Sequence, residues 1–360
     1  MLYLTVFGTT FLLSVALTSV VKKLASYWNI FDVPNSERKI HDKPIPLLGG
    51  VAVFFSFALV LLVLTFGSNY ILGGFIDLKN IIGIVIAGLV IIIGGVLDDK
   101  FNLNPKIQII FPILASIIIV GAGIGIPSIR NPFGGLISFN NWQFILFWYQ
   151  GIPYKLTLLA DLFTLIWLMG MMYTTKLLDG LDGLVSGVTV IGALIIFAVA
   201  MSIKVDQANT ALIALILAGA FSGFLIFNFN PAKIFLGESG SMFAGLMLGV
   251  LAILSGSKVA TALLILGIPI LDVIWVILRR LFYHKKIAFA DRKHLHFRLL
   301  DIGLTQRQAV LLMYFLTALF GSFTLFFSTF GKLVALLILV IFMFIFAAFL
   351  VAKYKKQYEK

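Results

Sequence analysis

The sequence contains no cysteine and few charged residues. Of its 360 residues only 12% are charged and 61% are hydrophobic, whereas soluble domains are about 25% charged and about 45–50% apolar. The absence of cysteine excludes disulfides, zinc–thiolate sites and thiol nucleophiles. The shortage of charge excludes an ordinary soluble domain, because so much apolar surface needs a bilayer as its solvent.

Long apolar runs recur along the whole chain. A membrane-spanning helix needs about 20 mostly apolar residues. Eleven runs approach that length: 2–21, 47–66, 80–97, 107–126, 156–175, 184–203, 208–227, 240–256, 258–281, 308–330 and 331–352. The first run lacks a basic start and a small-residue cleavage site, which favours a spanning helix over a signal peptide. The sequence predicts an all-α, polytopic integral membrane protein with one transmembrane domain over 1–360.

Basic residues are distributed unevenly between the segments that join these runs. If the N-terminus lies outside, 21 of the 27 lysines and arginines fall in inner segments, which is the positive-inside bias. This orientation places the C-terminus in the cytoplasm and predicts a multi-pass protein of the inner, or plasma, membrane. It also explains the net charge of +12 without a nucleic-acid partner.

Acidic residues gather in the same inner segments. Asp98 and Asp99 end the third run, where they repel each other and oppose the helix dipole, which favours a bound cation. Lys106 follows at a distance that allows it to return to the same pocket. In the segment Asp179-Gly180-Leu181-Asp182-Gly183 the glycines let the backbone approach a ligand closely, and the carboxylates are candidates to hold Mg²⁺ or a nucleoside. The structural alternatives are a solvated acidic cap and a simple turn.

Three other inner segments are candidates for phosphate binding. The segment 34–46 is basic and proline-stiffened, although an ordinary cytoplasmic loop explains it equally well. The segment 228–241 opens a helix whose N-terminal amides attract an anion, although Ser239 or Ser241 could simply cap that helix. An extended run over 291–298 would direct alternate histidines to one side. A zinc site is the rival interpretation of those histidines, but they lack a good fourth ligand.

Two acids lie inside apolar runs, Asp161 and Asp272. Such acids serve as proton relays in transporters, but ion pairing or helix packing is the favoured interpretation of both. A transporter would concentrate its polar residues near the bilayer midplane, whereas here they concentrate at one face. After the histidines, Thr305 and Gln308 fit a capping box that begins the tenth helix.

The order of these segments resembles the polyprenyl-phosphate N-acetylhexosamine-1-phosphate transferases over about residues 30–315. The Arg292-x-His294-x-His296 pattern is similar to the WecA/TagO branch, whereas MraY-type phospho-MurNAc-pentapeptide transferases, the alternative, show three consecutive histidines. The resemblance implies transfer of a sugar 1-phosphate, GlcNAc-1-phosphate above all, from a UDP-sugar to undecaprenyl phosphate with release of UMP. Such a reaction begins the synthesis of envelope polysaccharides such as teichoic acid or lipopolysaccharide. Relatives are often dimers, so a homodimer is expected.

The resemblance also implies roles for individual residues. It assigns catalysis to Asp98, Asp99, Asp179 and Asp182. It implies Mg²⁺, with Mn²⁺ as a second candidate, and we expect Glu238, Asp98 and Asp179 as ligands. The residues expected to bind substrate are Arg38, His41, Lys106, Lys176, Asn228, Phe235, Arg292, His294, His296 and Arg298.

The chain departs from the family pattern in two places. Glu238 stands where the family usually has aspartate, and Tyr173 and Lys176 stand where it usually has asparagines. A charged lysine cannot ligate Mg²⁺. The sequence interpretation is therefore that Lys176 pairs with Asp179 or with a phosphate.

Overall fold

The computed structural model describes residues 1–34, 42–149, 152–203, 205–256, 258–282 and 294–358. Three of the residues expected to bind substrate, Arg38, His41 and Arg292, lie outside the described residues.

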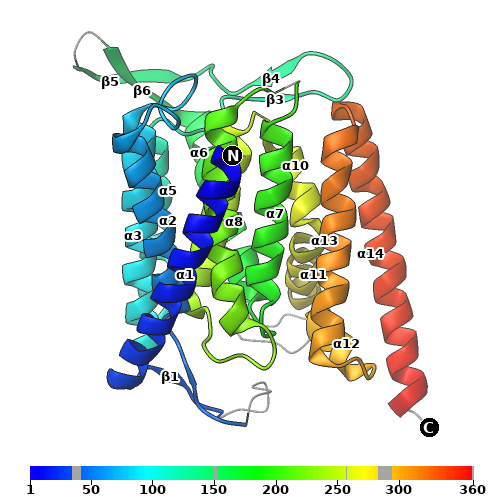
Figure 1. The fold of residues 1–360 in the computed structure, drawn as a ribbon. Helices are drawn as coiled ribbons and strands as arrows, with labels where there is room; N and C mark the ends of the chain where they lie inside the picture. The colour runs from blue at the N-terminus through cyan, green and yellow to red at the C-terminus, as the bar shows by residue number, and fades with distance from the viewer. Residues whose placement is uncertain (35–41, 150–151, 204, 257, 283–293, 359–360) are drawn as a thin grey trace.

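Helices make up most of the described chain (Figure 1). They are α1 (Leu2–Tyr27), α2 (Gly49–Gly67), α3 (Leu78–Phe101), α4 (Pro105–Gln108), α5 (Ile110–Gly121), α6 (Leu158–Leu178), α7 (Leu184–Ala200), α8 (Ala208–Asn228), α9 (Gly237–Leu254), α10 (Lys258–Ile265), α11 (Gly267–Phe282), α12 (Leu295–Asp301), α13 (Gln306–Phe326) and α14 (Thr329–Tyr358). Three antiparallel strand pairs lie between them: β1 (Phe31–Asp32) with β2 (Ile45–Pro46), β3 (Ser128–Arg130) with β4 (Leu136–Ser138), and β5 (Gln143–Tyr149) with β6 (Ile152–Thr157).

The helices confirm a polytopic membrane architecture. Within the described ranges, eight helices are long and apolar enough to cross a membrane, or nine if the bent pair α10–α11 forms one span. Every predicted apolar run corresponds to a helix or a helix pair, but two of them form shorter helices, Pro105–Gly121 and Leu184–Ala200. The run 258–281 bends by 82° between α10 and α11. The predicted count of eleven spans therefore stays a prediction.

The bend falls where the sequence permits a new helix to begin. Gly267 and Pro269 lie in the first turn of α11. Proline is tolerated in a first turn because the amides there have no partner within the helix. Continuing α10 through Pro269 would instead remove a hydrogen bond and create a backbone clash, so the single straight helix expected over 258–281 is replaced by two.

Close backbone contacts fix the position of α9 at the centre of the bundle. In α9, 83% of the apolar stretch is buried inside the protein, whereas in α14 the buried share of the apolar stretch is 17%. A Cβ added to Gly50 of α2 would clash with Gly240, and one added to Gly95 of α3 would clash with Ser239. Small residues of this kind let membrane helices approach closely. The beginning of α9, with Glu238, is therefore held between the beginning of α2 and the end of α3.

The two ends of the bundle differ (Figure 1). The strand pairs β3–β4 and β5–β6 lie at the upper end in this view, near the start of α1. The strand β1, the helix α12 and the end of α14 lie at the lower end. The start of α1 and the end of α14 are thus at opposite ends of the bundle.

Candidate functional site

The loop before α9 is held by side chains and by a neighbouring segment. Asn228 is buried at the end of α8; its Oδ1 accepts a hydrogen bond from Ser186 Oγ at 2.7 Å, and its Nδ2 donates to the carbonyl of Ile234 at 3.1 Å. The amide of Phe235 donates to the carbonyl of Pro46 at 2.8 Å, and the amide of Gly49 donates back to Phe235 at 3.0 Å. Asn228 therefore acts in this structure as a support for the loop that presents Glu238.

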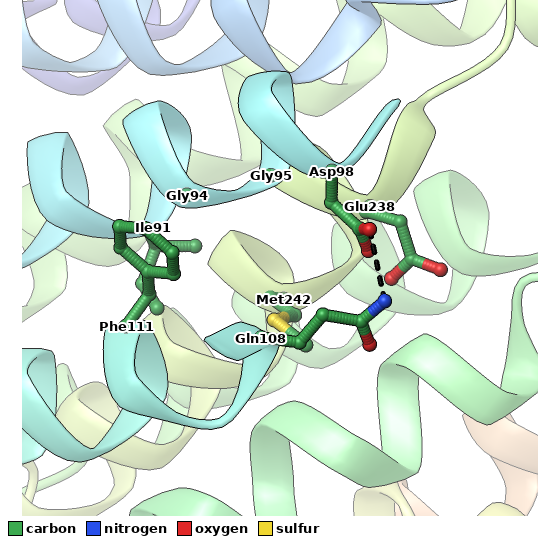
Figure 2. A pocket seen from close by; sticks show the side chains of 8 residues that line it. All are labelled: Ile91, Gly94, Gly95, Asp98, Gln108, Phe111, Glu238 and Met242. Atoms are coloured by element: carbon green, nitrogen blue, oxygen red, sulfur yellow. Dashed lines mark hydrogen bonds between the residues drawn. The ribbon is translucent and has the colours of Figure 1, made fainter. Parts of the chain in front are cut away.

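Asp98 closes the turn that follows α3. Its Oδ1 accepts hydrogen bonds from the amide of Leu103 at 2.9 Å and from Nε2 of Gln108 at 2.8 Å. The side chain is almost enclosed, since Asp98 is only 8% exposed. Figure 2 shows Asp98, Gln108 and Glu238 pointing toward one another at one side of a small pocket. Ile91 of α3 and Phe111 of α5 line its apolar side.

Asp99 caps the helix that carries Glu238. Its Oδ1 accepts a hydrogen bond from the amide of Glu238 at 3.1 Å, where a negative charge is favourable to the helix dipole. Gly237, the residue before Glu238, has φ +75°, and a Cβ at Gly237 would come within 2.5 Å of Oδ2 of Asp99. That Oδ2 is buried and has no hydrogen-bond partner among the described residues.

Lys176, at the end of α6, lies among these carboxylates. Its Nζ is 2.9 Å from Oε2 of Glu238 and donates a hydrogen bond to Oε1 of Gln108 at 3.2 Å. The interpretation that Lys176 pairs with Asp179 is wrong for this structure. Lys176 sits in the last turn of α6, and Glu238 lies in the first turn of α9. The packing of α6 against α9 therefore brings the two charges together.

The two aspartates after α6 have different environments. Oδ2 of Asp182 accepts hydrogen bonds from Nδ2 of Asn230 at 2.9 Å and from the amide of Ala232 at 3.0 Å, which ties this turn to the loop before α9. Removal of the Asp179 carboxyl from bulk water, and then the negative charges of Glu238 and Asp182, raise its pKa to about 8. Asp179 as a whole residue is exposed, although protein atoms surround its carboxyl group, so a ligand that enters the site can reach this residue.

The two described histidines lie side by side, but not on an extended run. His294 is the residue before α12, and His296 is already within that helix, so the extended conformation expected over 291–298 is wrong from Leu295 onward. The rings are nonetheless nearly parallel, with centroids 5.8 Å apart and an angle of 3° between their planes. Nδ1 of His294 lies 2.8 Å from Oδ2 of Asp272, whose Oδ1 accepts the amide of Leu295 at 2.9 Å.

His296 is the more enclosed of the two histidines. It is 1% exposed, and its Nε2 is buried without a hydrogen-bond partner among the described residues. Burial lowers its pKa to about 4, so the ring is neutral near pH 7. A Cβ added to Gly180 would clash with that Nε2. The Asp-Gly-x-Asp-Gly turn and the histidine pair thus meet at His296.

Several expected site residues take other places. Lys106 is exposed, and Gln108 is the residue of that segment that contacts the acidic group. Phe235 and Arg298 are half-buried. The inspection of the sequence missed Gln108, whose only signal is an amide in an apolar stretch. For Asp272 the sequence favoured ion pairing or helix packing, and in the structure this residue contacts His294 at 2.8 Å.

The carboxylates of this site are candidate ligands for Mg²⁺. Across the part of the chain that the structure describes, no group of three or more histidine, aspartate or glutamate side chains is placed to hold a metal by itself. Mg²⁺ often takes only one or two carboxylates, together with substrate phosphates and water. The orphaned Oδ2 of Asp99 fits such a ligand, and the charges of Glu238, Asp98 and Asp179 all act on Asp99. The residues present therefore fit one Mg²⁺ whose coordination is completed by substrate.

Comparison with known proteins identifies the family of the chain. The model of glycosyl transferase family 4 matches residues 81–256, which include the acidic residues from Asp98 to Glu238. A probable undecaprenyl-phosphate N-acetylglucosaminyl 1-phosphate transferase of Bacillus subtilis is 32% identical over 344 residues, which are 92% of this chain and 87% of that protein. The decaprenyl-phosphate N-acetylglucosaminephosphotransferase of Mycolicibacterium smegmatis is 31% identical over 82% of this chain and 75% of its own.

A third relative is more distant but still nearly full-length. The undecaprenyl-phosphate alpha-N-acetylglucosaminyl 1-phosphate transferase of Yersinia pestis is 28% identical over 86% of this chain and 80% of its own. The apolar bundle and the polar site at one of its ends thus define a membrane transferase. The chain belongs to glycosyl transferase family 4.

Proposed function

We propose that the protein transfers N-acetylglucosamine 1-phosphate from UDP-GlcNAc to undecaprenyl phosphate and releases UMP. The observation that carries this proposal is the similarity over 92% of the chain to a relative whose name states this kind of transfer. The site supports it, because carboxylates from the ends of α3 and α6 and the start of α9 converge with a histidine pair.

The proposed reaction is a single displacement at phosphorus. An oxygen of the lipid phosphate attacks the β-phosphorus of the UDP-sugar, the bond from that phosphorus to the bridging oxygen breaks, and UMP leaves with that oxygen. The second pKa of a phosphate monoester is about 6, so the nucleophile is already mostly dianionic at neutral pH. A strong general base is not required. We therefore assign Asp98 and Asp99 to positioning the lipid phosphate and the cation rather than to proton removal.

Negative charge must be neutralised where the two phosphates meet. Bound Mg²⁺, or Mn²⁺, would supply this by stabilising charge on the phosphate oxygens as the bond breaks. Asp99 and Glu238, with Asp98 or Asp179, would hold it. His296, which is neutral near pH 7, is suited to donate a hydrogen bond to a phosphate or sugar oxygen from its Nε2, which has no hydrogen-bond partner among the described residues.

The proposal fixes an orientation for the bundle. We place the end with β1 and α12 in the cytoplasm, because UDP-sugars are made there and because the basic segments lie at the same helix ends. In this arrangement the N-terminus is outside, the bundle crosses the plasma membrane up to eleven times, and the lipid reaches the site from the inner leaflet.

The direct test is UMP release by the purified full-length protein in detergent, with undecaprenyl phosphate, Mg²⁺ and UDP-GlcNAc. We expect release that needs both lipid and metal and that disappears in Glu238→Ala. Release with UDP-GalNAc and none with UDP-GlcNAc would keep the reaction and change the sugar. Absence of release with every UDP-sugar would overturn the proposal and favour a transporter.

A further inference from the structure

We propose that Lys176 is an internal counter-cation of this site. It pairs with Glu238 while the site is empty, and it must leave Glu238 before a divalent cation binds there, after which it contacts the nucleotide diphosphate. The inference rests on the proposed function for the identity of that diphosphate. It concerns the order and strength of cation binding, which the transfer reaction itself does not define.

The first support is the geometry of the ion pair. Nζ of Lys176 lies 2.9 Å from Oε2 of Glu238, with side chains that are 17% and 34% exposed. Such partial burial makes the attraction stronger than in a pair on the surface. The ammonium is held beside Glu238 by opposite charge, so a cation that neutralises this carboxylate weakens the attraction that keeps Lys176 there.

The second support is the way Gln108 fixes the other side of the ammonium. Nε2 of Gln108 donates to Asp98 Oδ1 and to the carbonyl of Leu103, both at 2.8 Å. These two bonds turn Oε1 of the amide toward Lys176, which donates to it at 3.2 Å. The resting place of the ammonium is thus built by a fixed amide on one side and a carboxylate on the other.

The third support is electrostatic. A divalent cation on Glu238 would stand within a few ångströms of the ammonium, where the two positive charges repel strongly in a partly buried site. The ion pair and a metal on Glu238 therefore exclude each other. A lysine has a flexible four-carbon stem, so Nζ can swing from Glu238 toward an incoming anion without movement of α6. An anionic diphosphate would attract both cations and so allow both to stay.

The test is a titration of the purified full-length protein with Mn²⁺, in which free Mn²⁺ is measured by electron paramagnetic resonance. Without nucleotide, we expect Lys176→Met to bind Mn²⁺ about five- to tenfold more tightly than the unchanged protein, which is somewhat more than an exposed ion pair contributes because this pair is partly buried. Lys176→Arg keeps the charge and should stay within about twofold. The control is Lys100→Met, which removes an exposed lysine next to Asp99 that lies over the ring of Phe101.

Two further measurements test separately the competition for Glu238 and the contact of Lys176 with the diphosphate. Glu238→Gln added to Lys176→Met should abolish the tighter binding, because the competition is for Glu238. Saturating UDP should tighten Mn²⁺ binding more in the unchanged protein than in Lys176→Met, because only the former gains a cation for the diphosphate. If Lys176→Met does not fold, Lys176→Gln carries the same comparison.

Equal Mn²⁺ affinity in the unchanged protein and in Lys176→Met would overturn the inference. An equal gain from UDP in the two proteins would overturn its second half. Neither measurement requires turnover. A protein that shows the affinity shift but releases no UMP would contradict the proposed function alone, whereas UMP release without the shift would contradict the counter-cation alone.

Discussion

Lys176 and Glu238 contact each other at 2.9 Å across the packed helices α6 and α9. They are also two of the positions at which the chain departs from the pattern of the family it resembles. The longer side chain of glutamate, relative to aspartate, reaches the lysine that stands in place of an asparagine. The two departures therefore form one structural unit.

This contact predicts coupling between the two positions. Glu238→Asp should shorten the side chain and move its carboxylate away from the Lys176 ammonium, and Lys176→Asn should remove the positive charge that contacts Glu238. We expect each single change to lower UMP release about tenfold or more, and the double change to recover part of the loss. A double-mutant cycle on kcat/KM should give a coupling of about 1–2 kcal/mol. Strictly additive effects would show that the contact has no energetic role.

Gln108 connects Asp98 to Lys176, so both the donor and the acceptor of its side-chain amide should be needed for activity. Gln108→Glu replaces the donor that faces Asp98 with a second negative charge, and we expect UMP release to fall about 100-fold, the scale for losing a charge-positioning group in an active site. Gln108→Met keeps the volume without the charge and should fall less. Gln143→Leu, an exposed residue of β5, is the control. Equal activity of Gln108→Glu and the unchanged protein would show that the Asp98–Gln108 contact is dispensable.

Asp272 should act through His294, whose Nδ1 it contacts at 2.8 Å. Asp272→Asn keeps the shape but loses the charge that orients the ring and fixes its tautomer. We expect kcat for UMP release to fall about 10- to 100-fold with little change in the KM for UDP-GlcNAc. Asp161→Asn is the matched control, since Asp161 is also a helix acid but accepts a hydrogen bond from the amide of Thr157, the residue before α6. A purely structural role would instead lower the melting temperature and leave kcat per folded molecule unchanged.

The pKa of His296 predicts a dependence of stability on pH. Burial lowers that pKa from 6.5 to about 4, so between these values the unfolded chain binds a proton that the folded chain does not. The contribution to stability is full above about pH 6.5 and is lost as the pH falls toward 4, with about 2 kcal/mol lost by pH 5. Melting temperatures in detergent should fall over this range, and less steeply in His296→Gln. Identical slopes would contradict the assignment.

Local patterns in the sequence predicted much of this molecule. Apolar runs predicted the helices because burial in a bilayer depends on length and composition. The capping box at Thr305 is confirmed, with Oγ1 of Thr305 accepting the amide of Gln308 at 3.3 Å and Oε1 of Gln308 accepting the amide of Thr305 at 2.9 Å. Both signals lie within a few neighbouring residues, so no knowledge of tertiary packing was needed.

The partners of the site residues could not be predicted in the same way. Lys176 pairs with Glu238 and not with Asp179, which is nearer in sequence. The packing of α6 against α9 brings the Lys176 ammonium and the Glu238 carboxylate together. The contact between Gln108 and Asp98 depends on a sharp turn at Asn102, which has a left-handed backbone with φ +50°.

Gly180 should be intolerant of even one added carbon. A Cβ there would clash with Nε2 of His296, an atom on the ring rather than at the end of a flexible chain. The backbone of Gly180 has no positive φ, so Gly180→Ala would act through its contacts with the rings of His296 and Phe297 and displace them. We expect UMP release to fall about tenfold or more while the melting temperature changes little. Gly121→Ala, where an added Cβ meets nothing within 4 Å, is the control. Full activity of Gly180→Ala would show that the position of His296 is not needed for transfer.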